Sequence, residues 1–207
     1  MTNSPKAYEG TYEPEILYDF DPRNLPPEML RAVGLVATAA SQTESITQDF
    51  ISGLLGIDQF EGRALTTHMS APLKDHIARA IAELNGPSMS EVDEIDDTLD
   101  RINAAIAKRN VIVHNALCRH PDTGEIFSFR EQARGSLRIS LQPVTAAEFE
   151  KDALLIYEAG MDLMRFMVSR GIAPRARSRP LHAPINRGQK ARTKRRNAIT
   201  GRSGGKA

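Results

Sequence analysis

Residues 88–114 read SMSEVDEIDDTLDRINAAIAKRNVIVH. The segment opens with Ser88 and, three residues later, Glu91, which is the pattern of a capping box, where both side chains satisfy free backbone N–H groups at a helix start. Arg109 falls at a position of its helical stripe where a core residue is expected. The stripe itself consists of apolar residues at spacings of three and four, as on one face of a helix: Val92, Ile95, Leu99, Ile102, Ile106 and Val113.

An earlier helix is predicted over residues 27–55. Pro27 suits its first turn, because the missing N–H would be unpaired there, and Gly56 suits its end. Its expected core face contains one charged residue, Glu44. The face comprises Val33, Ala37, Ala40, Glu44, Thr47, Ile51 and Leu54.

Two more helices are expected. One spans residues 71–84, is stopped by Asn-Gly-Pro at residues 85–87, and has Leu73, Ile77, Ala80, Ile81 and Leu84 on its apolar side. Residues 146–169 form the other, which Gly171 ends. Thr145 and Glu148 make a second capping box at the start of this last helix. Three residues widen its apolar face, so we expect it to be largely buried: Leu155, Met164 and Val168.

The helical pattern is interrupted between residues 118 and 142. Residues 136–142 alternate strictly between apolar and polar side chains, residues 126–129 are similarly strand-like, and residues 122–124 favour a turn. We therefore predict a β-hairpin inserted between the last two helices.

These patterns predict a mainly α protein with three regions. Residues 1–26 contain four prolines and no sustained period, which indicates an extended N-terminal arm. Residues 27–171 form a four-helix bundle with the hairpin at about residues 118–142. Residues 172–207 hold too few apolar residues to offset the entropy of ordering them, so a disordered tail is expected.

Composition limits the compartment and the chemistry. One cysteine, Cys118, cannot form an internal disulfide, and no stretch approaches the roughly 18 apolar residues of a membrane span. The first 24 residues lack the apolar run of a signal peptide. We expect a cytoplasmic protein with no membrane partner. The histidines show no metal-ligand spacing, so neither a metal site nor a cofactor is expected.

Charge is distributed unevenly along the chain. Residues 172–207 contain 11 of the 27 basic residues and no acidic residue, which leaves 16 basic against 26 acidic residues before them. The tail is thus +11 and the body −10. Six tail residues are the expected phosphate ligands of a nucleic acid: Arg187, Lys190, Arg192, Lys194, Arg195 and Arg196.

Arg109, Asn110 and His114 are the candidate catalytic residues. Residues four apart on a helix share a side, so the Asn110 amide is expected to orient the His114 imidazole. Histidine transfers protons and arginine binds phosphate oxygens. RNA cleavage needs a base, an acid and positive charge on the phosphate, which this set supplies without a metal once a symmetric dimer provides a second histidine.

The sequence RNVIVH at residues 109–114, near the end of a long helix, resembles the Arg-x4-6-His motif of the HEPN superfamily. The polar residue directly after the arginine is also typical of that family. The resemblance covers residues 27–171 and implies a helical, dimeric, metal-independent endoribonuclease with Arg109, Asn110 and His114 as catalytic residues. Many members act as toxins or in phage defence, so the expected partners are RNA, a second copy and a cognate antitoxin.

Other interpretations remain open. Arg109 is expected to form a buried ion pair with Glu44, because a lone charge in a core needs a partner, and this pair suits a structural or a catalytic arginine. His114 would also be stabilised at a helix end by the helix dipole. The alternative function is a non-catalytic HEPN-like nucleic-acid-binding or scaffold module. A third is a body that recruits partners while the tail targets ribosomes or DNA.

Overall fold

The computed structural model describes residues 18–85, 88–133 and 137–178. Its helices and strands belong to one unit that extends to Arg175. The helices are η1 (Pro22–Asn24, a 3-10 helix), α1 (Pro27–Leu55), α2 (Gln59–Thr66), α3 (Ala71–Leu84), α4 (Met89–His114) and α5 (Ala146–Arg170). The strands are β1 (Ala116–Arg119), β2 (Ile126–Ala133) and β3 (Leu137–Pro143). A mainly α fold is therefore confirmed, and its four expected long helices are present.

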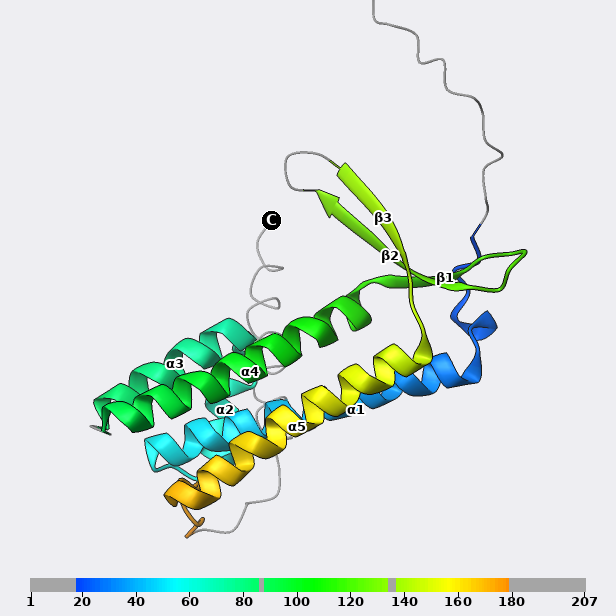
Figure 1. Ribbon diagram of the computed structural model, residues 1–207. Helices are drawn as coiled ribbons and strands as arrows, with labels where there is room; N and C mark the ends of the chain where they lie inside the picture. The colour runs from blue at the N-terminus through cyan, green and yellow to red at the C-terminus, as the bar shows by residue number, and fades with distance from the viewer. Residues whose placement is uncertain (1–17, 86–87, 134–136, 179–207) are drawn as a thin grey trace, which may run out of the picture. The chain divides into compact units, whose positions relative to one another are not determined.

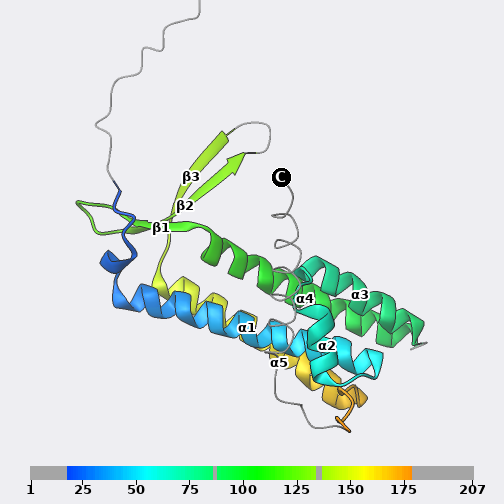
Figure 2. The ribbon, with the colours of Figure 1, turned by 180° about the vertical axis from the view of Figure 1, so that it is seen from behind.

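The long helices lie side by side (Figures 1 and 2). α1 and α5 run in the same direction, and α4 runs antiparallel to α5, which two ion pairs reflect: Lys108 with Asp152, and Arg101 with Asp162. α3 packs against both α1 and α4. The helix α2 was not predicted from the sequence. This helix begins with a capping box formed by Asp58 and Glu61.

The contact between α1 and α5 is close because of one glycine. Thr43 Oγ1 donates a hydrogen bond of 2.9 Å to the Ile156 carbonyl. A Cβ at Gly160 would lie 2.6 Å from Thr43 Oγ1, so only glycine allows the two helices to come this close. This contact fixes which side of α1 faces the core. The buried face is rotated from the predicted one, since it includes Ala32, Val36 and Ala39, whereas Ala37 and Glu44 are exposed.

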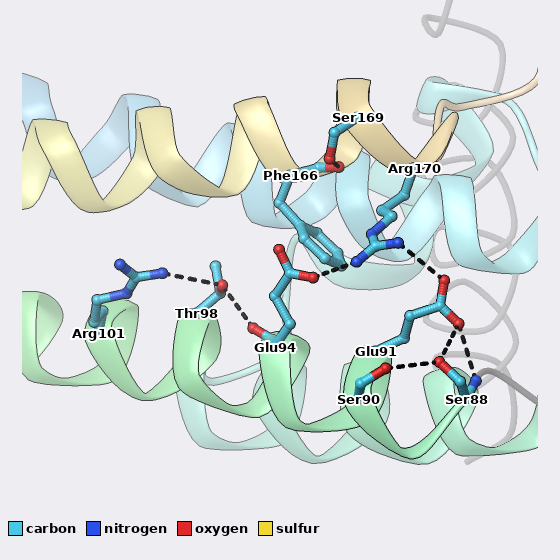
Figure 3. Close-up of polar contacts among 9 residues, drawn as sticks. All are labelled: Ser88, Ser90, Glu91, Glu94, Thr98, Arg101, Phe166, Ser169 and Arg170. Atoms are coloured by element: carbon cyan, nitrogen blue, oxygen red, sulfur yellow. Dashed lines mark hydrogen bonds and ion pairs between the residues drawn. The ribbon is translucent and has the colours of Figure 1, made fainter.

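The start of α4 is fastened to the end of α5 (Figure 3). The predicted capping box of Ser88 and Glu91 is present, with Ser88 N donating to the Glu91 carboxylate at 2.9 Å. Arg170 of α5 donates to both Glu91 and Glu94, and its guanidinium lies 5.9 Å from the Phe166 ring centroid. Exposed pairs such as these contribute at most about 1 kcal/mol each, so they set the helix register more than the stability.

A small antiparallel sheet connects α4 to α5, with strand order β1-β2-β3. β2 and β3 confirm the predicted hairpin, but β1 was not predicted. The arm joins this sheet through a backbone bridge between Asp19 and Arg119. Tyr18 packs edge-on against Phe127, and Phe20 against Phe129. The rest of the expected arm, residues 1–17, lies outside the described residues.

Two expectations about the C-terminal part are wrong. α5 is not largely buried, because the outer side chains Leu155, Met164 and Val168 are exposed, Val168 to 75%. The body does not end at Gly171: Arg175 N donates a 2.8 Å hydrogen bond to the Ile57 carbonyl, so residues 172–175 pack on the helices. No helix in the described ranges has the length and apolar character to cross a membrane.

Candidate functional site

Arg109, Asn110 and His114 meet at the C-terminal end of α4. Arg109 Nη1 donates a 2.9 Å hydrogen bond to Asn110 Oδ1 and lies 3.3 Å from His114 Nε2. The arginine is half-buried, while the asparagine and the histidine are exposed. The Arg109 guanidinium lies beside the imidazole, as the length of its side chain allows, whereas the expected hydrogen bond from the Asn110 amide to His114 is not among the contacts of the described residues.

The contacts of Arg109 are with uncharged groups. Within the described ranges, no carboxylate lies at ion-pair distance from its guanidinium. A hydrogen bond between the two groups runs from Arg109 Nη1 to His114 Nε2, because a guanidinium has no acceptor atom. The site thus presents an uncompensated cation beside a nitrogen able to accept a proton.

The sheet fixes the end of the helix that carries His114. Asn115 leaves the helix in an extended conformation (φ −88°, ψ 142°), and β1 begins at the next residue. Asn115 Nδ2 donates to Ser128 Oγ of β2 at 3.3 Å. This connection holds the last turn of α4 against the sheet.

The expected ion pair of Glu44 with Arg109 is wrong. Glu44 instead accepts a hydrogen bond from Lys74 Nζ of α3, and the side chain of Lys74 is only 4% exposed. A buried ammonium needs a compensating charge more than a half-buried guanidinium does. Arg109 lies at the edge of the core stripe, which passes from Ala105 to Ile112 behind it.

A pocket of about 350 Å³ lies between α1, α3 and α4, next to these residues. Arg109 and Asn110 both belong to its lining, and Arg109 also contacts His114. The remaining lining combines apolar and polar side chains. It comprises Glu44, Thr47, Ser70, Ala71, Pro72, Lys74, Asp75, Leu99, Ile102, Asn103 and Ile106.

Sequence reasoning missed Lys74 and Asn103. The expected apolar side of residues 71–84 placed Leu73 and Leu84 in the core, but both are exposed, and Lys74, Ala78 and Ala82 are buried instead. The four-residue spacing of the latter set was a usable signal, hidden by the rule that lysine seldom enters a core.

Three further expectations concern groups elsewhere in the sequence. The six tail residues from Arg187 to Arg196 fall outside the described residues. Cys118 is buried, and burial raises the pKa of its thiol above the usual value, which disfavours a nucleophilic thiolate. Over the described ranges, the structure contains no group of three or more His, Cys, Asp or Glu side chains suited to a metal ion.

Comparison with known proteins identifies no relative. No family model matches the chain, and neither a curated protein nor a solved structure is significantly similar to it.

Proposed function

We propose that this chain is a HEPN-like endoribonuclease that acts as a homodimer and cleaves RNA without a metal ion. Arg109, Asn110 and His114 are its catalytic residues, and a toxin or defence component is its proposed biological role. The observation that supports this most is the contact between Arg109 and His114, in which a guanidinium with no carboxylate partner among the described residues lies 3.3 Å from an imidazole nitrogen.

The proposed reaction is a transesterification at phosphorus. His114 Nε2 accepts the proton of a ribose 2′-hydroxyl, whose oxygen then bonds to the adjacent phosphorus. Arg109 donates to the phosphate oxygens, where negative charge accumulates. The bond from phosphorus to the 5′-oxygen breaks, and that oxygen takes a proton. The products are a 2′,3′-cyclic phosphate and a 5′-hydroxyl.

Protonation of the leaving 5′-oxygen is the reason that the proposed enzyme is a dimer. One imidazole that has just accepted a proton on one side of the phosphate is poorly placed to protonate the leaving oxygen opposite. A second copy, facing the first across the RNA, supplies His114 in its protonated form. Asn110 has a positioning role, because its Oδ1 holds the guanidinium that contacts the imidazole.

The alternative is a non-catalytic HEPN-like nucleic-acid-binding or scaffold module. It is favoured because, in the part of the chain that the structure describes, His114 is the one titratable side chain in contact with Arg109. In that case the guanidinium and the basic tail would bind phosphates, and no bond would be broken.

Incubation of the purified full-length chain with mixed RNA distinguishes the two functions. The enzyme is expected to produce fragments that end in 2′,3′-cyclic phosphate, in the presence of EDTA as well as in its absence. RNA that is bound but remains intact over a range of protein concentrations would favour the binding module.

A further inference from the structure

The pocket between α1, α3 and α4 adjoins the contact of Arg109 with His114, yet the reaction proposed above uses only two of its lining residues. Its volume of about 350 Å³ is within the range of small-molecule sites, roughly 300–1,000 Å³. The chemistry of the remaining wall indicates what it can hold.

Part of this wall is apolar. Leu99, Ile102 and Ile106 contribute from α4, and Ala71 and Pro72 from the first turn of α3. Surfaces of this kind favour an uncharged group with flat faces over a hydrated ion.

The charges in the pocket wall are largely compensated. Glu44 is paired with Lys74, and Asp75 shares the guanidinium of Arg79 with Asp96 and Asp100 of α4. Arg109 is the remaining charged residue of the lining, and its contacts are with neutral groups. The pocket is thus close to neutral, with a cation where it meets the candidate catalytic residues.

Asn103 is a polar group available to a ligand. Its half-buried side chain lines the pocket, and within the described ranges no hydrogen bond occupies its amide. An amide offers two donors and an acceptor, which suits the edge of a nucleobase. Asn103 and Asn110 are two turns apart on one side of α4, about 10 Å along the axis, comparable to one nucleotide from base edge to phosphate.

We infer that this pocket is a base-selecting subsite. It takes one nucleobase of single-stranded RNA, from the nucleotide whose phosphate Arg109 binds, and Asn103 hydrogen-bonds to the edge of that base. Readout of unstacked bases by side chains is the usual basis of RNA sequence preference. The inference rests on the proposed function, because it places the phosphate at Arg109.

Binding of mononucleotides tests the subsite without requiring cleavage. The full-length His114→Ala variant is titrated with the four ribonucleoside 3′-monophosphates by calorimetry. We expect one base to bind at least about tenfold more tightly than the weakest, the scale of one well-placed hydrogen-bonding pair. Adding Asn103→Ala should remove that preference. Adding Ala71→Phe should fill the pocket and abolish binding, whereas Ala80→Phe, at an exposed position of α3 outside the lining, should not.

The outcomes separate this inference from the proposed function. Equal affinity for all four nucleotides, no binding, or an Ala71→Phe variant that remains folded by circular dichroism and binds like its parent would overturn the subsite, even if the wild type cleaves RNA. Selective binding that depends on Asn103 would support it, even if the wild type leaves RNA intact and the proposed catalysis fails.

Discussion

Lys74 Nζ donates a hydrogen bond to a carboxylate oxygen of Glu44, although the lysine side chain is 4% exposed and the glutamate side chain 54% exposed. The pair joins α3 to α1 in the wall of the pocket. Removal of the two charges should affect stability differently. Loss of the Glu44 carboxylate leaves an unpaired ammonium in the core, whereas loss of the Lys74 ammonium leaves a carboxylate that still reaches water.

Glu44→Ala should therefore reduce the free energy of unfolding by about 2–3 kcal/mol, the range for stranding a buried charge. Glu28→Ala, at an exposed position in the first turn of the same helix, is the control and should change it by at most about 1 kcal/mol, the contribution of a charge to the helix dipole. Urea denaturation measures both. Equal stabilities of the two variants would show that Lys74 does not depend on Glu44.

Gly160→Ala should destabilise the contact between α1 and α5. Its Cβ would lie 2.6 Å from Thr43 Oγ1, and relief of such overpacking usually costs about 1–3 kcal/mol. Gly34→Ala is the matched control, because a Cβ there meets no atom within 4 Å and alanine favours a helix by up to about 1 kcal/mol. The melting temperature should fall for Gly160→Ala and rise for Gly34→Ala. A stabilised Gly160→Ala would contradict the close packing.

Acid should weaken the start of α4. Hydrogen bonds from the Ser88 backbone and hydroxyl lower the pKa of Glu91, and the charge of Arg170 contributes. A carboxyl with a lower pKa in the folded chain adds stability above its unfolded value, near 4.3, and loses it as pH falls through the folded value. The difference in melting temperature between wild type and Glu91→Gln should shrink as pH is lowered from about 6 to 3. A difference independent of pH would exclude an ionised cap.

The basic tail should contribute sequence-independent RNA affinity. Truncation after Ser178 retains the segment that packs on α1 and removes the six residues from Arg187 to Arg196. If about five charges of the tail bind single-stranded RNA, the log–log salt dependence should flatten by roughly 3–4 units. Binding titrations at several salt concentrations measure this. Identical slopes would mean that the tail does not bind phosphates.

The sequence predicted the features that local chemistry determines. Capping boxes at Ser88 and Thr145, and glycine ends at Gly56 and Gly171, placed the bounds of three helices almost correctly. The shorter elements were missed. β1 has only four residues and no visible period, whereas the eight residues of α2 did follow a readable capping box.

In the candidate site too, local contacts were predictable from the sequence and contacts between helices were not. RNVIVH is continuous in the sequence, so helical geometry alone brings Arg109 close to His114. The partner of Glu44 depends on how α3 is rotated against α1, and that rotation is set by packing between residues 30 positions apart. Local spacing carries no information about such a choice, which is why Arg109 was expected where Lys74 lies.

If Arg109 and His114 together cleave RNA, the cleavage rate of a labelled single-stranded RNA in EDTA depends on both side chains. We expect wild type and the control His68→Ala, an exposed histidine outside the site, to cleave at equal rates. Arg109→Ala and His114→Ala should each lower the rate at least about 100-fold, the usual contribution of a proton-transfer group or a charge on the transition state, while their helicity is unchanged. Cleavage that survives both substitutions, or that stops on addition of EDTA, would contradict the proposed catalysis.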